Sequence, residues 1–144
     1  MSAEHMREES RRWMEQARSD VAAAMDSTKA GHFNWACFQA QQAAEKAMKS
    51  VWYQLDLDPW GHSVAKLVDG LPHDLVGDNF EEANEPARHL DKLYIPTRYP
   101  NGLPGITPTE AYDVKDAESA IAAAERILTL VRQFISAVLG RGEE

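Results

Sequence analysis

Apolar residues recur at three- and four-residue steps over three long stretches that contain neither glycine nor proline: residues 1–30, 33–58 and 109–139. This spacing places the apolar side chains on one face of an α-helix. Each stretch is therefore predicted to form a helix with a buried face. Gly31 follows the first stretch, at the position where a left-handed residue commonly ends a helix.

The last stretch has the most regular pattern, with steps of three and four residues in strict alternation. The apolar positions are Val114, Ala117, Ile121, Ala124, Leu128, Val131, Ile135 and Val138. Such a pattern is typical of a helix in a bundle. Ile127, Leu130 and Phe134 widen the stripe, as expected of a helix that packs in a globular bundle or also contacts a second subunit.

Two neighbouring stripes run along residues 33–58. One consists mainly of alanines, on which another helix can pack closely. The other places Gln41 and Glu45 among large apolar side chains, where a carboxylate needs partners. We expect Gln41 and Glu45 to form a buried polar network that fixes bundle or dimer register, with a ligand-facing carboxylate as the alternative. Asp20, at the edge of the first helix face, either belongs to this network or faces water.

Shorter helices are predicted over residues 63–71 and 79–94, where Pro86 kinks the second helix or marks its start. Residues 95–108 contain four prolines and two glycines and are predicted to form a loop, a type of segment that is often functional. Thr107 and Glu110 then give a start that resembles a capping box. No strand pattern is present. The predicted fold class is all-α: an up-and-down bundle of four long helices plus one short helix, in a single domain of residues 1–144.

The composition narrows the function classes. Lys and Arg number 15 against 23 Asp and Glu, a net charge of −8, which argues against binding to duplex DNA. Cys37 is the one cysteine, so a disulfide framework and a multi-cysteine zinc site are excluded and a cytoplasmic location is expected. No apolar run approaches the roughly 20 residues that span a bilayer. The histidines lack metal-ligand spacing, and no metal or cofactor is predicted.

Three stretches carry a more specific signal: Cys37 to Lys49 with its Gln-Gln-Ala-Ala-Glu-Lys run, Gly61-His62-Ser63, and Tyr94 to Pro100 with its Thr-Arg-Tyr-Pro run. In this order they resemble the HEPN family of all-α domains, over most of the chain. The resemblance implies a bundle of four or five helices, often homodimeric, in a family associated with nucleotides, RNA and toxin–antitoxin systems. Some members partner a minimal nucleotidyltransferase.

The sequence departs from the family at one motif. Many HEPN ribonucleases carry an arginine followed after four to six residues by a histidine, and this pair serves metal-independent RNA cleavage at the dimer interface. Counted from Arg98, those positions hold Leu103, Pro104 and Gly105, and no histidine follows His89. Cleavage by the 2′-hydroxyl requires proton transfer, which an arginine cannot supply. We therefore expect binding without cleavage.

Arg98 and Tyr99 are the leading ligand-binding candidates, because a guanidinium can hold a phosphate and a tyrosine ring can stack on a base. The alternative is that Arg98 pairs with a carboxylate and Tyr99 packs on the bundle. Lys46 and Lys49 are candidates for added positive charge, or are ordinary solvated lysines, with Glu45 and Lys49 as a pair on the helix surface. His62 is a candidate replacement for the missing base, or a turn residue that hydrogen-bonds to backbone.

The interpretation is a HEPN-like module, expected to be a binding protein rather than an enzyme, that homodimerises and associates with a nucleotide or RNA. A nucleotidyltransferase is the expected protein partner. Two other functions remain open. One is a metal-independent ribonuclease toxin that uses Arg98 with His62 or another acid–base group. The other is a structural dimerisation or partner-binding bundle that recognises no nucleotide.

Overall fold

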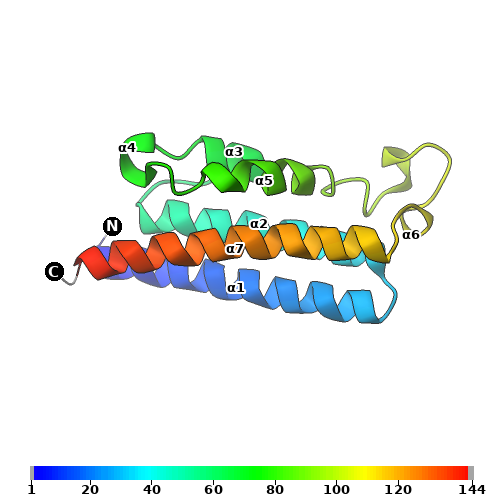
Figure 1. Ribbon diagram of the computed structural model, residues 1–144, viewed down its shortest axis with the longest axis horizontal. Helices are drawn as coiled ribbons and strands as arrows, with labels where there is room; N and C mark the ends of the chain where they lie inside the picture. The colour runs from blue at the N-terminus through cyan, green and yellow to red at the C-terminus, as the bar shows by residue number, and fades with distance from the viewer. Residues whose placement is uncertain (1, 143–144) are drawn as a thin grey trace.

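Three long helices form the body of the molecule: α1 (Ala3–Lys29), α2 (Phe33–Gln54) and α7 (Val114–Gly142). The computed structural model describes residues 2–142, with side chains up to residue 140; Met1 and residues 143–144 of the predicted domain lie outside this range. The three helices lie side by side, and both ends of the described chain are at the same end of the bundle (Figure 1). The predicted all-α fold class is confirmed, and residues 2–142 contain no β-strand.

The α1–α2 pair is the most extensive helix contact in the bundle. The predicted alanine stripe of α2, which packs against both α1 and α7, is fully buried: Ala36, Ala40, Ala43, Ala44 and Ala47. Small side chains let two helix backbones approach closely. Gly31 lies between the two helices with a φ of 83°, in the left-handed region that glycine adopts without strain, so the chain can reverse direction within a few residues.

Four short elements cover α2 on the side away from α1 (Figure 1). They are α3 (Val64–Asp69), α4 (His73–Val76), the 3₁₀ turn η1 (Glu81–Ala83) and α5 (Asn84–Asp91). The predicted helix over residues 79–94 is replaced by η1 and the eight-residue α5, so the structure has three long helices within residues 2–142 and not the four that were predicted. Pro86 is the third residue of α5, where its missing N–H needs no partner, and its ring prevents the helix from extending further toward the N-terminus.

The loop between α5 and α7 contains two short helical turns, η2 (Pro100–Gly102) and α6 (Pro108–Ala111). The first corrects the expectation of a loop without helical structure. The predicted capping box is confirmed, since the Thr107 hydroxyl accepts from the Glu110 N–H and the Glu110 carboxylate accepts from the Thr107 N–H.

The third long helix begins at Val114, five residues later than predicted. A second reciprocal contact sets this start: Asp113 Oδ1 accepts from the Asp116 N–H at 3.0 Å, and Asp116 Oδ2 accepts from the Asp113 N–H at 2.9 Å. The backbone N–H of Asp116 lowers the pKa of Asp113, because it stabilises the ionised carboxylate. Val114 is 42% exposed, so its predicted place in the buried seam is wrong; it lies in the first turn, before α7 meets its neighbours.

The core lies where α7 meets α2 and α5. Phe134 is 1% exposed, and its ring packs against the ring of Phe80 at 5.3 Å between centroids and 63° between planes. Leu90 of α5 and Ile127 of α7 are completely buried in the same cluster. None of the helices within residues 2–142 is long and apolar enough to cross a membrane.

Cys37 is buried on α2, and we predict that it is unreactive in the folded protein. Burial, followed by the negative charges of Asp116 and Asp113, raises the pKa of the thiol to about 12. At pH 9 roughly 0.1% of such a thiol is ionised, whereas an exposed cysteine is mostly thiolate. Alkylation by iodoacetamide, followed by mass spectrometry, should be slow in buffer and fast in urea. Rapid labelling of folded protein at pH 9 would contradict the burial of this residue.

Candidate functional site

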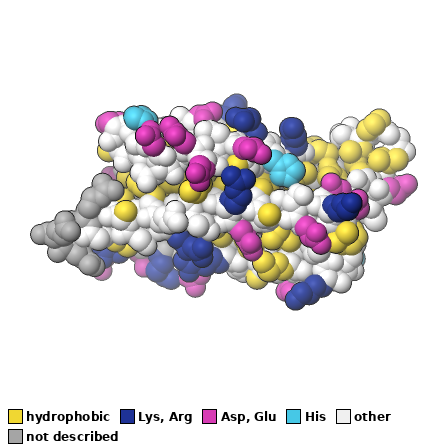
Figure 2. All heavy atoms as spheres, in the orientation of Figure 1, with side chains coloured by type: hydrophobic (Ala, Val, Ile, Leu, Met, Phe, Trp, Pro, Cys, Tyr) yellow, Lys and Arg dark blue, Asp and Glu magenta, His cyan; other side chains and the backbone are white. Residues whose placement is uncertain are grey.

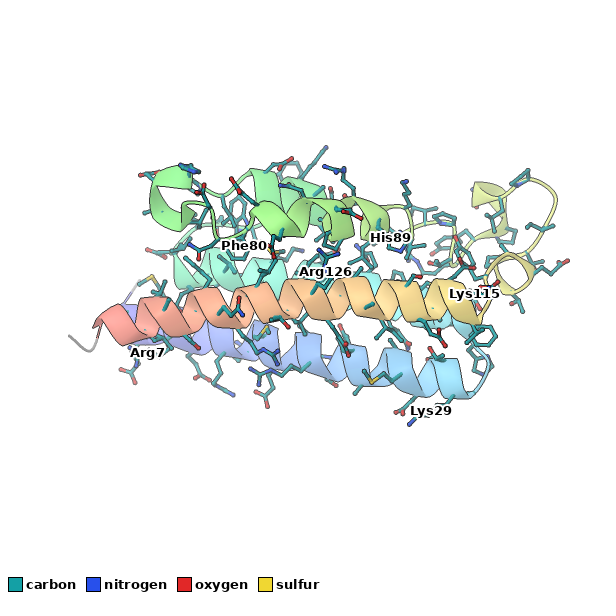
Figure 3. The ribbon with its side chains drawn as sticks, viewed as in Figure 1. Arg7, Lys29, Phe80, His89, Lys115 and Arg126 are labelled. Carbon is teal, nitrogen blue, oxygen red and sulfur yellow. The ribbon has the colours of Figure 1, made fainter. Side chains whose placement is uncertain are left out.

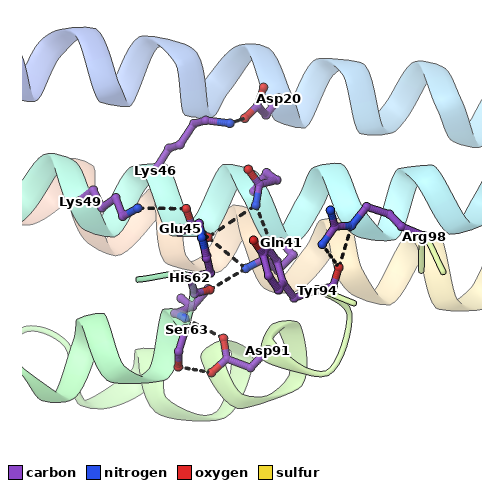
Figure 4. A network of polar contacts seen from close by, with 12 residues as sticks. Asp20, Gln41, Glu45, Lys46, Lys49, His62, Ser63, Asp91, Tyr94 and Arg98 are labelled. Carbon is purple, nitrogen blue, oxygen red and sulfur yellow. Dashed lines mark hydrogen bonds and ion pairs between the residues drawn. The ribbon is translucent and has the colours of Figure 1, made fainter. Parts of the chain in front are cut away.

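A polar network lies on the face of α2 that the short helices cover (Figure 4). Gln41 and Glu45 are 0% and 4% exposed. Gln41 Nε2 donates to the His62 carbonyl oxygen at 2.9 Å, and Lys49 Nζ donates to Glu45 Oε2 at 3.1 Å. Glu45 Oε1 also lies 3.3 Å from His62 Nδ1. The basic partners of the buried carboxylate are thus Lys49 and His62, and Arg98 contributes nothing to it.

Asp20 lies outside this network. Its Oδ2 pairs with Lys46 Nζ at 2.5 Å, which links α1 to α2, and its Oδ1 accepts from Gln16 Nε2 at 2.9 Å. The side chains of Asp20 and Lys46 are 16% and 24% exposed. The two candidate lysines therefore each have a carboxylate partner, Asp20 for Lys46 and Glu45 for Lys49. Neither adds an unpaired positive charge to the site.

Arg98 lies among three aromatic rings. Its guanidinium carbon is 4.1 Å from the centroid of Phe38, 4.7 Å from that of Tyr94 and 5.1 Å from that of Tyr99. Arg98 Nε and Nη2 both donate to the Tyr94 carbonyl oxygen, at 2.9 and 2.7 Å. No carboxylate whose side chain the structure describes pairs with this half-buried guanidinium. The alternative interpretation, in which Arg98 pairs with a carboxylate, is therefore not found among those residues.

The turn that presents Arg98 is anchored to α2. Thr97 is completely buried; its hydroxyl donates to the Leu93 carbonyl at 2.7 Å, and its own carbonyl accepts from Asn34 Nδ2 at 3.0 Å. The Arg98 N–H donates to the Ile95 carbonyl at 3.1 Å. The hydrogen bonds of the buried Thr97 and of the Arg98 N–H together fix the backbone of this turn.

Tyr94 brings His62 and Arg98 into one cluster. The His62 ring stacks on Tyr94 at 4.8 Å between centroids and 17° between planes, and in the view of Figure 4 the tyrosine lies between His62 and Arg98. The His62 side chain is 59% exposed. His62 is therefore near Arg98, as a replacement for the missing base would have to be. The Tyr94 ring lies between His62 and the guanidinium.

The sequence did not identify Asp91 as a residue of the site, nor Phe38 and Tyr94 as aromatic neighbours of Arg98. Asp91, at the end of α5, accepts from the Ser63 hydroxyl at 2.7 Å and from the Val64 N–H at 2.6 Å, which fixes the turn that carries His62. No local pattern marks Asp91, because its partners are almost thirty residues earlier. Tyr94 had a signal, since it begins the Tyr94-to-Pro100 stretch.

The site offers cationic, aromatic and hydrogen-bonding groups rather than metal ligands. Within the described residues, no three His, Cys, Asp or Glu side chains are placed to hold a metal ion. A half-buried guanidinium among rings can hold an anion, and partly exposed rings such as Tyr99, which is 49% exposed, can stack on a planar group.

The chain is similar in sequence to known proteins. The model of the HEPN domain family matches residues 10–134. A curated protein of Methanocaldococcus jannaschii, named "Putative toxin MJ1304", is 24% identical over 89% of each chain.

Solved structures are similar over nearly the whole chain. TT1696 from Thermus thermophilus has a TM-score of 0.81 and 41% identity, over 86% of this chain and 96% of its own. ST0689, described as an archaeal HEPN homologue, has a TM-score of 0.70 and 34% identity, over 86% and 95%. A HEPN domain protein of Thermotoga maritima has a TM-score of 0.65 and 30% identity, over 87% and 98%.

Proposed function

Because the chain belongs to the HEPN domain family, we propose that it binds a nucleotide or single-stranded RNA at Arg98 without cleaving it. One observation carries the proposal: the Arg98 guanidinium lies among Phe38, Tyr94 and Tyr99 and has a main-chain carbonyl, not a carboxylate, as its partner among the described residues. A positive charge without a carboxylate partner, next to exposed aromatic surface, is the pairing that recognises a phosphate and an unstacked base.

The guanidinium keeps most of its hydrogen-bonding capacity. It has five N–H donors, and the Tyr94 carbonyl takes one from Nε and one from Nη2. The remaining donors can hold two oxygens of a phosphate, since the guanidinium fork matches phosphate geometry. The Tyr99 ring, 49% exposed, offers a face for stacking. Base–aromatic stacking contributes about 1–3 kcal/mol per base and tolerates any sequence.

The absence of cleavage is proposed from the chemistry of the groups near Arg98. Arginine does not titrate near neutrality, and no histidine follows it in the sequence. Transesterification by a 2′-hydroxyl needs a group that takes and returns a proton. A phosphate-binding cation that the Tyr94 ring separates from His62, with rings for stacking beside it, is suited to holding a strand intact.

Fluorescence anisotropy with a labelled single-stranded RNA tests the proposal. We expect Arg98→Ala to weaken binding by about ten- to a hundredfold, because a charge-assisted contact is lost. Arg98→Lys should fall between, since lysine keeps the charge but not the fork. Arg88→Ala on α5 removes the same charge from an exposed position and serves as the matched control. Equal losses in Arg98→Ala and Arg88→Ala would show that Arg98 is not the site.

A second candidate function is a metal-independent ribonuclease toxin; the Methanocaldococcus relative is named a putative toxin. The observation that favours it is the Tyr94 ring in contact with both His62 and Arg98. When His62 Nδ1 donates to Glu45, Nε2 is left as the nitrogen available for proton transfer. RNA incubated with the protein and a chelator separates the two functions. Cleavage abolished by both His62→Ala and Arg98→Ala would establish the ribonuclease and overturn the non-catalytic proposal.

We also propose that the chain forms a homodimer and that a nucleotidyltransferase is its protein partner. Support for a protein-binding surface comes from four large apolar side chains on or near the Arg98 turn that are 41–49% exposed: Trp35, Ile95, Tyr99 and Ile106. Figure 2 shows apolar side chains gathered over the loop at this end of the molecule. Their proximity to Arg98 would place a partner beside the bound ligand.

A further inference from the structure

An arginine-lined groove lies between the first half of α1 and the last half of α7, far from Arg98. Its volume is about 550 Å³. Four of the nine arginines in the sequence line it: Arg7, Arg11, Arg18 and Arg132. Figure 2 shows Lys and Arg side chains gathered along the border of α7 and α1, and Figure 3 places Arg7 at the end of this border. We call this groove, which these four arginines and the other lining residues named below surround, the arginine groove.

The concentration of positive charge follows from the α1 sequence. Arg7, Arg11 and Arg18 are separated by four and seven residues, which places them on one side of the helix. Arg132 meets them from α7. One carboxylate, Glu15, also lines the groove, so four positive charges face one negative charge in a chain of net charge −8.

Most of this charge has no carboxylate partner. Arg11 is bound by Glu8 and Glu15, at 2.7 and 2.6 Å. Arg132 donates to the Thr129 hydroxyl at 3.2 Å. Arg7, Arg18 and Arg132 form no ion pair with any residue whose side chain the structure describes. Three guanidinium groups around one groove therefore keep donors free for an anion.

The groove also has an interior in which part of a ligand can be buried. Met14, Ile135 and Leu139 give it apolar walls, and Gln54 reaches it from the end of α2. Gln54 Oε1 is buried and has no hydrogen-bond partner among the described residues. A buried acceptor without a partner is unfavourable, and a donor group of a ligand would satisfy it.

We propose that the arginine groove binds an oligophosphate, either as a free chain or as part of a nucleoside triphosphate. Guanidinium forks match phosphate oxygens, and three unpaired cations match the several negative charges of a short phosphate chain. The groove is within the size range of small-molecule sites, roughly 300–1,000 Å³. Its apolar walls and the Gln54 oxygen could take a base or a hydroxyl.

This site is separate from the one proposed above. Gln54 and Phe38 lie 16 positions apart on α2, which corresponds to roughly 24 Å along the helix axis. The two proposals can therefore fail independently, and variants of Arg98 tell them apart.

Isothermal titration calorimetry of the full chain with sodium tripolyphosphate, ATP and adenosine tests the proposal. We expect tripolyphosphate and ATP to bind, adenosine not to bind, and the affinity to fall with added salt. An ATP affinity about tenfold above that of tripolyphosphate would show that the nucleoside contributes, and equal affinities would identify the phosphate chain as the ligand; both support the proposal.

The variant Arg18→Gln/Arg132→Gln keeps much of the side-chain length and should weaken tripolyphosphate binding by at least about tenfold. The matched control is Arg88→Gln/Arg126→Gln, which removes two charges from α5 and from the side of α7 that faces α5 (Figure 3). The control should keep the affinity, and tripolyphosphate should still bind to Arg98→Ala, in which any phosphate contact of the site proposed above is removed. The proposal is overturned if tripolyphosphate does not bind at millimolar concentration, if the control loses as much affinity, or if an acidic peptide binds in its place.

Discussion

Replacing Lys49 with methionine should lower the free energy of unfolding by about 3–5 kcal/mol, as expected when a buried ion pair loses one partner. The Glu45 side chain is 5% exposed and that of Lys49 is 12% exposed, at 3.1 Å. Without Lys49 the carboxylate keeps the half-exposed His62 as its one basic contact among the described residues. Urea unfolding followed by far-UV circular dichroism measures the loss.

Two controls make the Lys49 result specific. Lys46→Met breaks the Asp20 pair, whose side chains are more exposed at 16% and 24%, and should cost about 1 kcal/mol. Lys49→Met/Glu45→Leu removes both charges and should be more stable than Lys49→Met alone, because no unpaired carboxylate is left in the interior. If Lys49→Met costs no more than Lys46→Met, then Glu45 is not buried as described.

Phe134→Ala should destabilise the fold by about 3–5 kcal/mol, the usual range for a large aromatic removed from a core. The ring is 1% exposed and packs edge-on against Phe80, so its removal leaves a cavity where α7 meets the layer of short helices. Denaturant midpoints at equal slope would report this change as a loss of stability alone.

The contact between the two rings can be measured separately. A double-mutant cycle with Phe80→Ala should give a coupling of about 0.5–1.5 kcal/mol for an edge-to-face pair. Leu130→Ala, at a half-buried position of the same helix, should cost less than Phe134→Ala. A Phe134→Ala variant as stable as Leu130→Ala would be inconsistent with the described core.

The long helices and their buried faces could be predicted because periodicity is a local property. The alanine stripe of α2 follows directly from residue spacing, and so do the buried Ile127 and Phe134 of α7. The break before α7 could not be found in this way, since Tyr112 and Asp113 interrupt a helical pattern without glycine or proline. Side chains that cap a new helix start, here Asp113 with Asp116, decided the outcome.

The candidate site was only partly predictable. Spacing on α2 identified Gln41 and Glu45 as buried polar residues and placed Lys49 one turn from Glu45, but it could not say that His62 would be a partner. The cluster around Arg98 depends on Tyr94 and on a turn held by Thr97, which are tertiary contacts between segments far apart in sequence. The buried face of a helix can be predicted from one segment of sequence. A contact between two segments can be predicted only when the positions of both in space are known.

The Tyr94 carbonyl has an entropic consequence for Arg98. By accepting from both Nε and Nη2, it immobilises a side chain that would otherwise keep about 2 kcal/mol of rotamer freedom. The side chain is ordered before an anion binds, so the entropic cost of ordering it does not weaken the binding. The fixed N–H donors favour anions whose oxygens fit the plane of the guanidinium. Lysine at this position would retain the charge but lose this preorganisation.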